Sequence, residues 1–442
     1  MAVYENREAF IPYRRADIIE LCLEDGQLPS SDLQKFREFC EILSAYFHFK
    51  FHQTLEVLKD NFAPFNPDAD TKLRIEPSPE ARQQMAAKLA SAFHNLLQSA
   101  NYVAISEDSL QRAFAEKSLI ELKTKVEFDD FDQIVCYCRG DIYRMTWVKK
   151  WFRKVEKTLD VFERVALLIK FKEKAYFESK SDKSQKLSFT PGKMYVYLYK
   201  NIPKFDMEFL FPNVKVSMTW KDRLLLIVPA MGAAVPVLIK ALPQILLIVG
   251  VILFYTGNIP GLEDLKASED QVRNFMPVLA AILSMTVAFG GLAFKQYNSY
   301  KNKQLKFQKN VTDTLFFRNL ANNMGVFHSL IDAAEEEECK EIILVYYHLL
   351  TSNGALTKEQ LDNQIESWMD RKFGTKIDFD INGPLRNLEE IRGKIIKEGI
   401  EEANIQETPL LSYDRDGCCQ VLPLEDAKML IDYVWDNAFA YW

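Results

Sequence analysis

The chain has 442 residues and a formal net charge of −7, from 55 Lys and Arg against 62 Asp and Glu. The length allows two or three domains, and the acidic balance argues against a general nucleic-acid binder, so we expect no nucleic-acid partner. The seven cysteines are odd in number and contain no C-x-x-C pair, which argues against a secreted disulfide framework.

Residues 1–220 are predicted to form an N-terminal α+β domain. Helix-start residues and apolar periodicity indicate three helices, and β-rich runs after residue 119 indicate a small antiparallel sheet. The predicted helices are Arg14–Leu23, Ser30–Asp60 and Glu80–Ala100. The predicted strands are Leu119–Phe128, Gln133–Arg139, Val165–Lys172, Met194–Leu198 and Val214–Trp220.

Basic and aromatic residues are interleaved between two of these strands, at Trp147, Lys149, Lys150, Trp151 and Arg153. Such a stretch is typical of an amphipathic helix packed on the sheet. The alternative is a segment on a membrane surface, with aromatic rings inserted and cations at the lipid headgroups. The sequence leaves both interpretations open.

Residues 221–296 carry the strongest apolar signal and are predicted to be a membrane region. Residues 275–294 contain no charge, and 20 residues of helix match a hydrocarbon core of about 30 Å. The run 224–257 is too long for one straight crossing and contains three prolines. We therefore place a span at about 238–255 and expect 224–237 to be interfacial or half-inserted.

The charges around these segments predict a two-pass topology. The segment between the spans is acidic and a run of lysines follows the second span, so the positive-inside rule places both large domains on the cytoplasmic side. The expected location is a bacterial plasma or thylakoid-type membrane with anionic lipid headgroups as partner. The lysines expected to contact those headgroups are Lys295, Lys301, Lys303, Lys306 and Lys309.

Residues 297–442 are predicted to form a long linker helix, reaching about Ala321, and a winged-helix-like C-terminal domain. The acidic run Glu335–Glu338 indicates a solvated helix start that the helix dipole favours, with a divalent-cation site as the alternative. Further along, Thr357 and Gln360 have the spacing of a capping box.

The remainder of this domain supplies a hairpin and a last helix. Asp-Gly at 416–417 lies between two short apolar runs, Leu410–Tyr413 and Cys418–Leu422, and this arrangement is a strong signal for a β-hairpin. A final helix is expected over Leu424–Phe439. Helices, a hairpin and a closing helix in this order favour a protein-contact module.

The motifs of the common enzyme classes are absent from the sequence. It contains no phosphate-binding or dinucleotide glycine loop, no H-E-x-x-H, no G-x-S-x-G and no zinc-type array of Cys and His. We therefore predict no catalytic residue, no metal site and no cofactor.

Several short stretches nonetheless carry a resemblance that extends over nearly the whole chain. They include Phe10–Arg15, Arg139-Gly140, Asp222-Arg223, Asn319–Asn323 and Trp435–Asn437. With these, the sequence resembles a membrane family of unknown function found in cyanobacteria and plastids, which includes mitochondrial transmembrane protein 143. The resemblance implies a two-span protein and supplies no activity. It marks as interaction candidates Pro203, Asp206, Glu208, Pro212, Asp222, Arg223, Asn319, Asn322 and Asn323.

Together these features predict a non-enzymatic, membrane-anchored scaffold or assembly factor. We expect it to form homo-oligomers and to contact an unknown protein partner. The alternative is an oligomeric anion channel or transporter, in which the proline-broken first segment lines the pore and exposes Lys240.

Overall fold

In the computed structural model the described residues are 10–68, 72–105, 123–150, 153–180, 187–217, 315–352, 354–396 and 406–438, with separate positions between 284 and 312. The chain divides into two compact units. The first combines Met1–Glu116, Glu127–Met207 and Phe317–Trp442, and the second combines Lys117–Val126 and Glu208–Phe316. In the second unit a short strand β2 (Lys123–Lys125) pairs antiparallel with β6 (Lys215–Ser217).

Three helices begin the first unit, as the sequence predicts: α1 (Arg15–Glu24), α2 (Leu33–Phe62) and α3 (Pro79–Ser99). Buried residues recur along α2 every three or four positions, from Phe36 through Leu43 to Leu58, which is the period of one helix face. Ser78 begins α3 by accepting a hydrogen bond from the backbone N–H of Ala81.

A five-stranded antiparallel sheet follows, and it confirms the α+β class and the predicted sheet. Its order is β1 (Val103–Ala104), β3 (Phe131–Lys150), β4 (Arg153–Phe171), β5 (Met194–Pro203) and β7 (Asn319–Asn322). A short helix, α5 (Lys174–Ser179), and the 3-10 turn η3 (Lys204–Leu210) lie on either side of β5 in the chain. The last strand of this sheet, β7, thus comes from a part of the chain more than 100 residues after β5.

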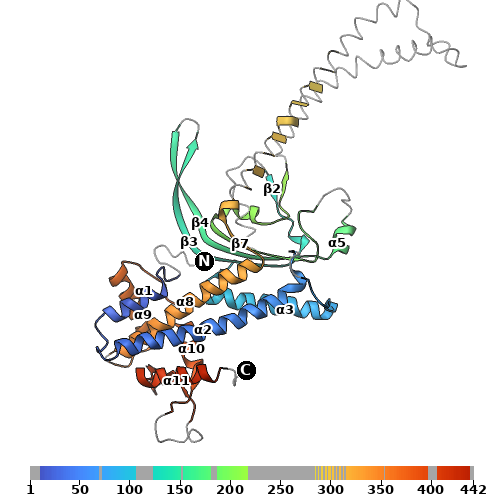
Figure 1. The fold of residues 1–442 in the computed structure, drawn as a ribbon. Coiled ribbons are helices and arrows are strands. Elements are labelled where there is room, and N and C mark those ends of the chain that lie inside the picture. Colours follow the sequence, from blue (N-terminus) through green and yellow to red (C-terminus); the bar gives the residue numbers. More distant parts are fainter. Residues whose placement is uncertain are drawn as a thin grey trace, which may run out of the picture. The chain divides into compact units, whose positions relative to one another are not determined.

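The C-terminal elements complete the helical part of the first unit (Figure 1). The helices are α8 (Met324–Thr351), α9 (Lys358–Phe373), α10 (Asn382–Glu390) and α11 (Leu424–Asp436). Between α10 and α11, β8 (Arg392–Gly393) pairs with β9 (Thr408–Pro409). There β10 (Leu411–Tyr413) also pairs with β11 (Cys419–Val421), which confirms the hairpin predicted around Asp-Gly.

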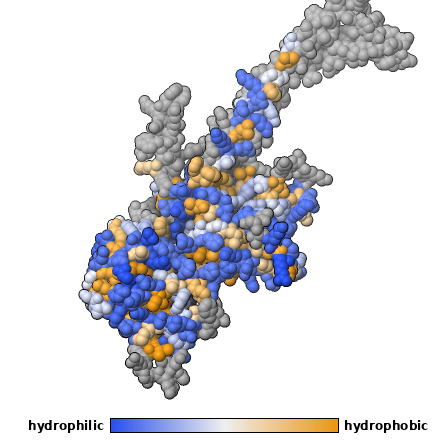
Figure 2. Space-filling model, in the orientation of Figure 1, coloured by the Kyte–Doolittle hydropathy of each residue, from blue (hydrophilic) through white to orange (hydrophobic). Residues whose placement is uncertain are grey.

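The hydrophobic core of the first unit is built around α8. All side chains from Cys339 to His348 are buried, because neighbouring helices surround this stretch on all sides. Sheet residues such as Ala166 and Val196 belong to the same core cluster. On the face shown in Figure 2, hydrophilic residues cover most of the helical part and apolar ones are scattered among them.

The described residues contain no helix long and apolar enough to cross a membrane. The longest two, α2 (30 residues) and α8 (28 residues), carry charges along their length and bury their apolar residues in the protein core. This finding corrects the predicted membrane fold with a two-span transmembrane hairpin, and the multi-pass location that depended on it. The segments predicted at 224–237 and 238–255 lie outside the described residues, as does most of 275–294.

Two further predictions about secondary structure are wrong. The stretch around Trp147 is not a helix packed on the sheet, because Trp147, Lys149 and Lys150 belong to β3 and Arg153 belongs to β4. The linker helix expected to reach Ala321 also ends earlier. Its described positions between 284 and 318 are helical, but pairing with β5 makes Asn319–Asn322 a strand.

Candidate functional site

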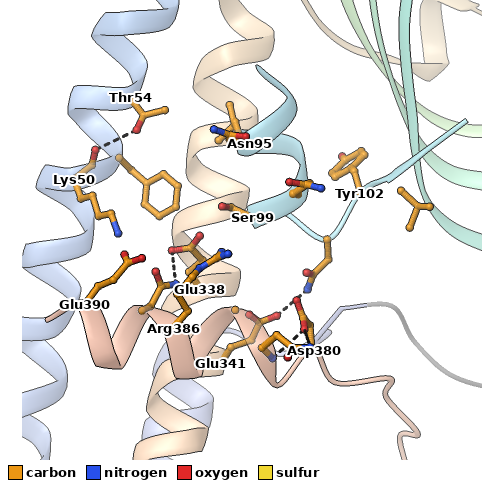
Figure 3. Close-up of a pocket in the computed structure, with 18 of the residues that line it drawn as sticks. Lys50, Thr54, Asn95, Ser99, Tyr102, Glu338, Glu341, Asp380, Arg386 and Glu390 are labelled. Carbon is orange, nitrogen blue, oxygen red and sulfur yellow. Dashed lines mark hydrogen bonds between the residues drawn. The ribbon is translucent and has the colours of Figure 1, made fainter. Parts of the chain in front are cut away.

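A polar pocket of about 780 Å³ lies among α2, α3, α8 and α10 in the first unit (Figure 3). The segment after α3 and the loop before α10 complete its wall. Its charged lining residues are the acids Glu338, Glu341, Asp378, Asp380 and Glu390 and the bases Lys50 and Arg386.

The most buried polar group of this pocket is Glu341 on α8, with 6% of its surface exposed. One of its carboxylate oxygens accepts a hydrogen bond of 2.8 Å from the side-chain amide of Asn101. Asn101 follows the end of α3 and has a φ of +59°, a left-handed conformation that Asn tolerates better than most residues. The end of α3 thus places an amide donor opposite Glu341.

Glu338 lies one helical turn before Glu341 and lines the same pocket. It accepts a hydrogen bond of 3.2 Å from the side chain of Asn387 on α10, and a second from Ser99. The positive charges of Lys50 and Arg386 also favour the ionised form of Glu338 and lower its pKa. Glu338 therefore has cationic neighbours, whereas Glu341 forms no ion pair with any described residue.

Burial changes the acidity of both groups. Burial raises the pKa of Glu341 well above its usual range, and the neighbouring carboxylates Glu337, Asp380 and Glu338 raise it further, against the hydrogen bond from Asn101. Burial also raises the pKa of Glu338. A negative charge at this wall is thus costly unless a proton or another cation accompanies it.

The acidic run Glu335–Glu338 proves to lie inside α8, so the expectation of a solvated helix start is wrong. Glu335 pairs with Arg15 at 3.6 Å, and the backbone N–H of Arg15 donates to Glu336 at 2.6 Å. Glu337 accepts from the N–H of Ile11, so the run binds the N-terminal segment. In the part of the chain that the structure describes, no group of three His, Cys, Asp or Glu side chains could hold a metal ion.

A second feature is the end of the β3–β4 pair. β1 pairs with β3 only at Tyr137 and Cys138, and β5 pairs with β4 only from Val161 onward. Between Asp141 and Lys150, β3 therefore pairs with β4 alone among the described strands. We call this pair, residues 141–150 and 153–160, the ribbon; Figure 1 shows it continuing past the sheet.

The basic and aromatic residues singled out in the sequence lie at the tip of the ribbon. Trp147, Lys149 and Lys150 end β3 and Arg153 begins β4, whereas Trp151 lies outside the described residues. At the other end, Lys204 lies 2.9 Å from both Asp141 and Asp160, so one cation holds the two strands together at the sheet.

The residues marked by the family resemblance fall into separate places. Pro203 ends β5, and Asp206 and Glu208 lie in η3, which Pro212 follows. Asp206 pairs with Arg318 at 3.5 Å, and burial raises the pKa of Asp206 to about 6. Asp222 and Arg223 lie outside the described residues.

The asparagines of that set have structural roles around the start of α8. Asn319 donates to Asn322 at 2.6 Å within β7. Asn323 donates to Asp68 at 2.9 Å, and its side-chain oxygen accepts from the backbone N–H of Val196 at 3.2 Å. Asn323, which immediately precedes α8, thus joins β5 to Asp68.

The remaining predicted residues precede β7 in the chain. Lys295, Lys301 and Lys309 are exposed helical residues, whereas Lys303, Lys306 and Lys240 lie outside the described residues. The contact of these lysines with lipid headgroups, and the pore that Lys240 would line, depended on the membrane fold corrected above.

Comparison with known proteins identifies one part of the chain. Residues 162–325 match a family described as a protein of unknown function (DUF3754). This stretch runs from the middle of β4 through β7 to the first turn of α8. No solved structure matches the chain.

The pocket was missed in the sequence because its residues come from four separate segments. Asn101, Asp380 and Asn387 match no catalytic or ligand-binding motif, and the pocket is formed only when α3 and α10 meet α8. The one available signal was the unusual placement of Glu338 and Glu341 beside the apolar run 342–347.

Proposed function

We propose that this chain is a non-enzymatic scaffold that self-associates, and that the ribbon makes the contact between copies. The observation that carries the proposal is the ribbon itself. It extends for eight residue pairs, or about 25 Å, with no third strand beside it among the described residues.

A two-stranded ribbon of this kind is marginally stable by itself, and none of the other described strands pairs with its outer backbone groups. Contact with another protein would satisfy these groups, as in strand addition to an exposed sheet edge. Two described side chains on it, Tyr143 and Met145, are 61% and 74% exposed and offer apolar contact area.

The charge pattern favours a second copy as the partner. The ribbon holds six Lys and Arg against three Asp and Glu, a net charge of +3, so the remainder of the chain carries −10. A basic ribbon and an acidic remainder attract each other between copies. Relationship to the cyanobacterial and plastid family remains part of the proposal, supported by the match over residues 162–325.

The test is photo-crosslinking between two copies of the full chain that carry different epitope tags and are expressed together. A photoreactive phenylalanine analogue replaces Met145 on the ribbon or, as a control, Ile75, which is similarly exposed (76%) but lies outside the ribbon. We expect a crosslink between the two tagged copies from position 145 and not from position 75.

Charge reversal at the tip, by Lys149→Glu, Lys150→Glu and Arg153→Glu together, should reduce this crosslink at least fivefold. The matched control reverses three exposed lysines elsewhere, Lys72, Lys88 and Lys174, and should leave it unchanged. Crosslinks from position 145 that reach only other proteins would show that the ribbon does not join two copies.

A further inference from the structure

We propose that the pocket among α2, α3, α8 and α10 binds a small organic cation, and that Glu341 and Glu338 pair with its ammonium or guanidinium group. This site is separate from the ribbon and does not depend on self-association.

The size of the pocket fits a small molecule. A cavity of about 780 Å³ falls within the range of about 300 to 1,000 Å³ that is typical of small-molecule sites. All its lining residues belong to the first unit, so the chain forms the site without a second copy.

The charge of the lining selects the sign of the ligand. Five carboxylates against two basic side chains give a formal charge of −3 at full ionisation. Such a surface attracts cations and disfavours phosphates and other anions. Because burial raises the pKa of Glu341 and Glu338, an ammonium group that pairs with them takes the place of their protons. Lys50 and Arg386 lie near Glu338, which leaves the Glu341 side of the pocket with an excess of carboxylates.

Glu341 supplies an observation that is independent of the total charge. Its side chain is more than nine-tenths buried, lines the cavity, and has one hydrogen bond, from Asn101 to Oε1. Its second oxygen, Oε2, has no hydrogen-bond partner among the residues described. A carboxylate that lines a cavity and has an oxygen without a partner is a natural acceptor for an N–H donor of a ligand.

The other walls favour an organic cation over a metal ion. Phe51, Leu96, Tyr102 and Val103 give the pocket apolar surface, which suits the methylene chain of an amine. The carboxylates do not converge, since no three acidic, His or Cys side chains of the described residues could share a metal. The amide oxygens and carboxylates are instead spread around the cavity, as Figure 3 shows for Asn95, Glu338 and Asp380.

Isothermal titration calorimetry of the full chain tests the proposal, with putrescine and spermidine as probes. We expect saturable binding of at least one of them. The neutral isostere 1,4-butanediol should produce no saturable heat, because it carries no positive charge. Magnesium chloride should produce none either, because Mg²⁺ has no methylene chain to pack against the apolar wall and the described residues offer it no group of metal ligands.

The variant Glu341→Gln removes the proposed charge but keeps the shape of the side chain and an acceptor for Asn101. We expect it to weaken binding at least tenfold. Glu24→Gln, which removes one exposed charge on α1 outside the pocket, should change the affinity less than twofold.

Should Glu341→Gln fail to fold, Glu390→Gln takes its place, because Glu390 is an exposed residue of the pocket wall whose neutralisation does not disturb the core. A two- to fivefold loss of affinity is expected there. The proposal is overturned if neither amine binds, if butanediol or magnesium binds as tightly, or if the pocket variants bind like the wild type.

Discussion

Helix α8 buries four polar side chains, and their surroundings differ. They are Glu337, Lys340, Glu341 and His348. Glu337 pairs with Lys340 at 3.1 Å, Glu341 faces the pocket, and His348 lies near the end of the helix. Burying a polar group costs free energy unless a partner compensates. Glu337 and Lys340 are partners of each other, and Glu341 accepts a hydrogen bond from Asn101, whereas Nε2 of His348 has no hydrogen-bond partner among the described residues.

His348 makes this cost measurable through pH. It is 3% exposed, and Gln364 contacts its Nδ1 at 3.3 Å while Nε2 has no hydrogen-bond partner among the described residues. Burial lowers the pKa of His348 to about 4, from an ordinary value of 6.5. Above pH 6.5 the imidazole is neutral in the folded and the unfolded chain, so it contributes no pH dependence there.

As the pH falls below 6.5, the unfolded chain takes up a proton that folded His348 accepts only near pH 4, so stability is lost in this window. Between pH 7 and 5 the loss amounts to about 2 kcal/mol. We expect His348→Gln to remove this loss, as followed by urea unfolding with the intrinsic tryptophan fluorescence of the chain. His328→Gln, an exposed position on the same helix, serves as control. Equal pH slopes for wild type and His348→Gln would contradict the assignment.

At the scale of single elements, α9 shows how local chemistry fixes a boundary. The hydroxyl of Thr357 accepts from the N–H of Gln360, and the side chain of Gln360 accepts from the N–H of Thr357, which confirms the predicted capping box. The other end stops at Gly374 with a φ of +62°, a conformation that glycine adopts without strain.

Loss of this cap should have a modest and specific effect. Thr357→Ala removes the acceptor for one backbone N–H and is expected to lower the free energy of unfolding by about 1 kcal/mol. Thr357→Ser keeps the hydroxyl and should remain within about half of that loss. Urea unfolding of both variants measures the difference, and an alanine variant as stable as the serine variant would show that the cap does not stabilise α9.

Elements of this kind are the part of the fold that the sequence predicts well. Helices α1, α2 and α3 begin and end within a few residues of their predicted positions, because capping residues and apolar periodicity act locally. The length of β3 was not predicted, since Gly140-Asp141 looks like the end of a strand. In the structure Gly140 has a φ of +69° inside β3, where a Cβ atom would meet the side chain of Glu163 on β4.

The pocket and β7 were not predictable for a different reason. Both depend on contacts between segments that are far apart in the sequence, and periodicity contains no information about such contacts. Asn101 meets Glu341 across 240 positions, and β7 joins a sheet whose other strands all precede residue 204. The membrane fold was inferred from local hydropathy alone, in a segment whose positions lie largely outside the described residues.

At the scale of the whole molecule, the N-terminal segment and α8 are held together by a buried ion pair. The ammonium of Lys340 donates to the carbonyl of Ile11 at 2.6 Å and to Glu337 at 3.1 Å, and Glu337 accepts from the N–H of Ile11. The side chains of Glu337 and Lys340 are each only 4% exposed. Residues more than 320 positions apart therefore share one buried polar cluster.

Removal of Lys340 should loosen this connection, because Glu337 would remain buried without its cation. We expect Lys340→Met to lower the free energy of unfolding by about 3 to 5 kcal/mol, and trypsin to cleave faster after Arg14 and Arg15. The double variant Glu337→Leu with Lys340→Met removes both charges and should recover part of the loss, although the backbone groups of Ile11 stay unpaired. Lys174→Met, which breaks the exposed pair with Glu178, is the matched control and should cost less than about 1 kcal/mol. If Lys340→Met unfolds at the same urea concentration as Lys174→Met, with unchanged proteolysis at the N-terminus, the buried pair does not hold the N-terminal segment to α8.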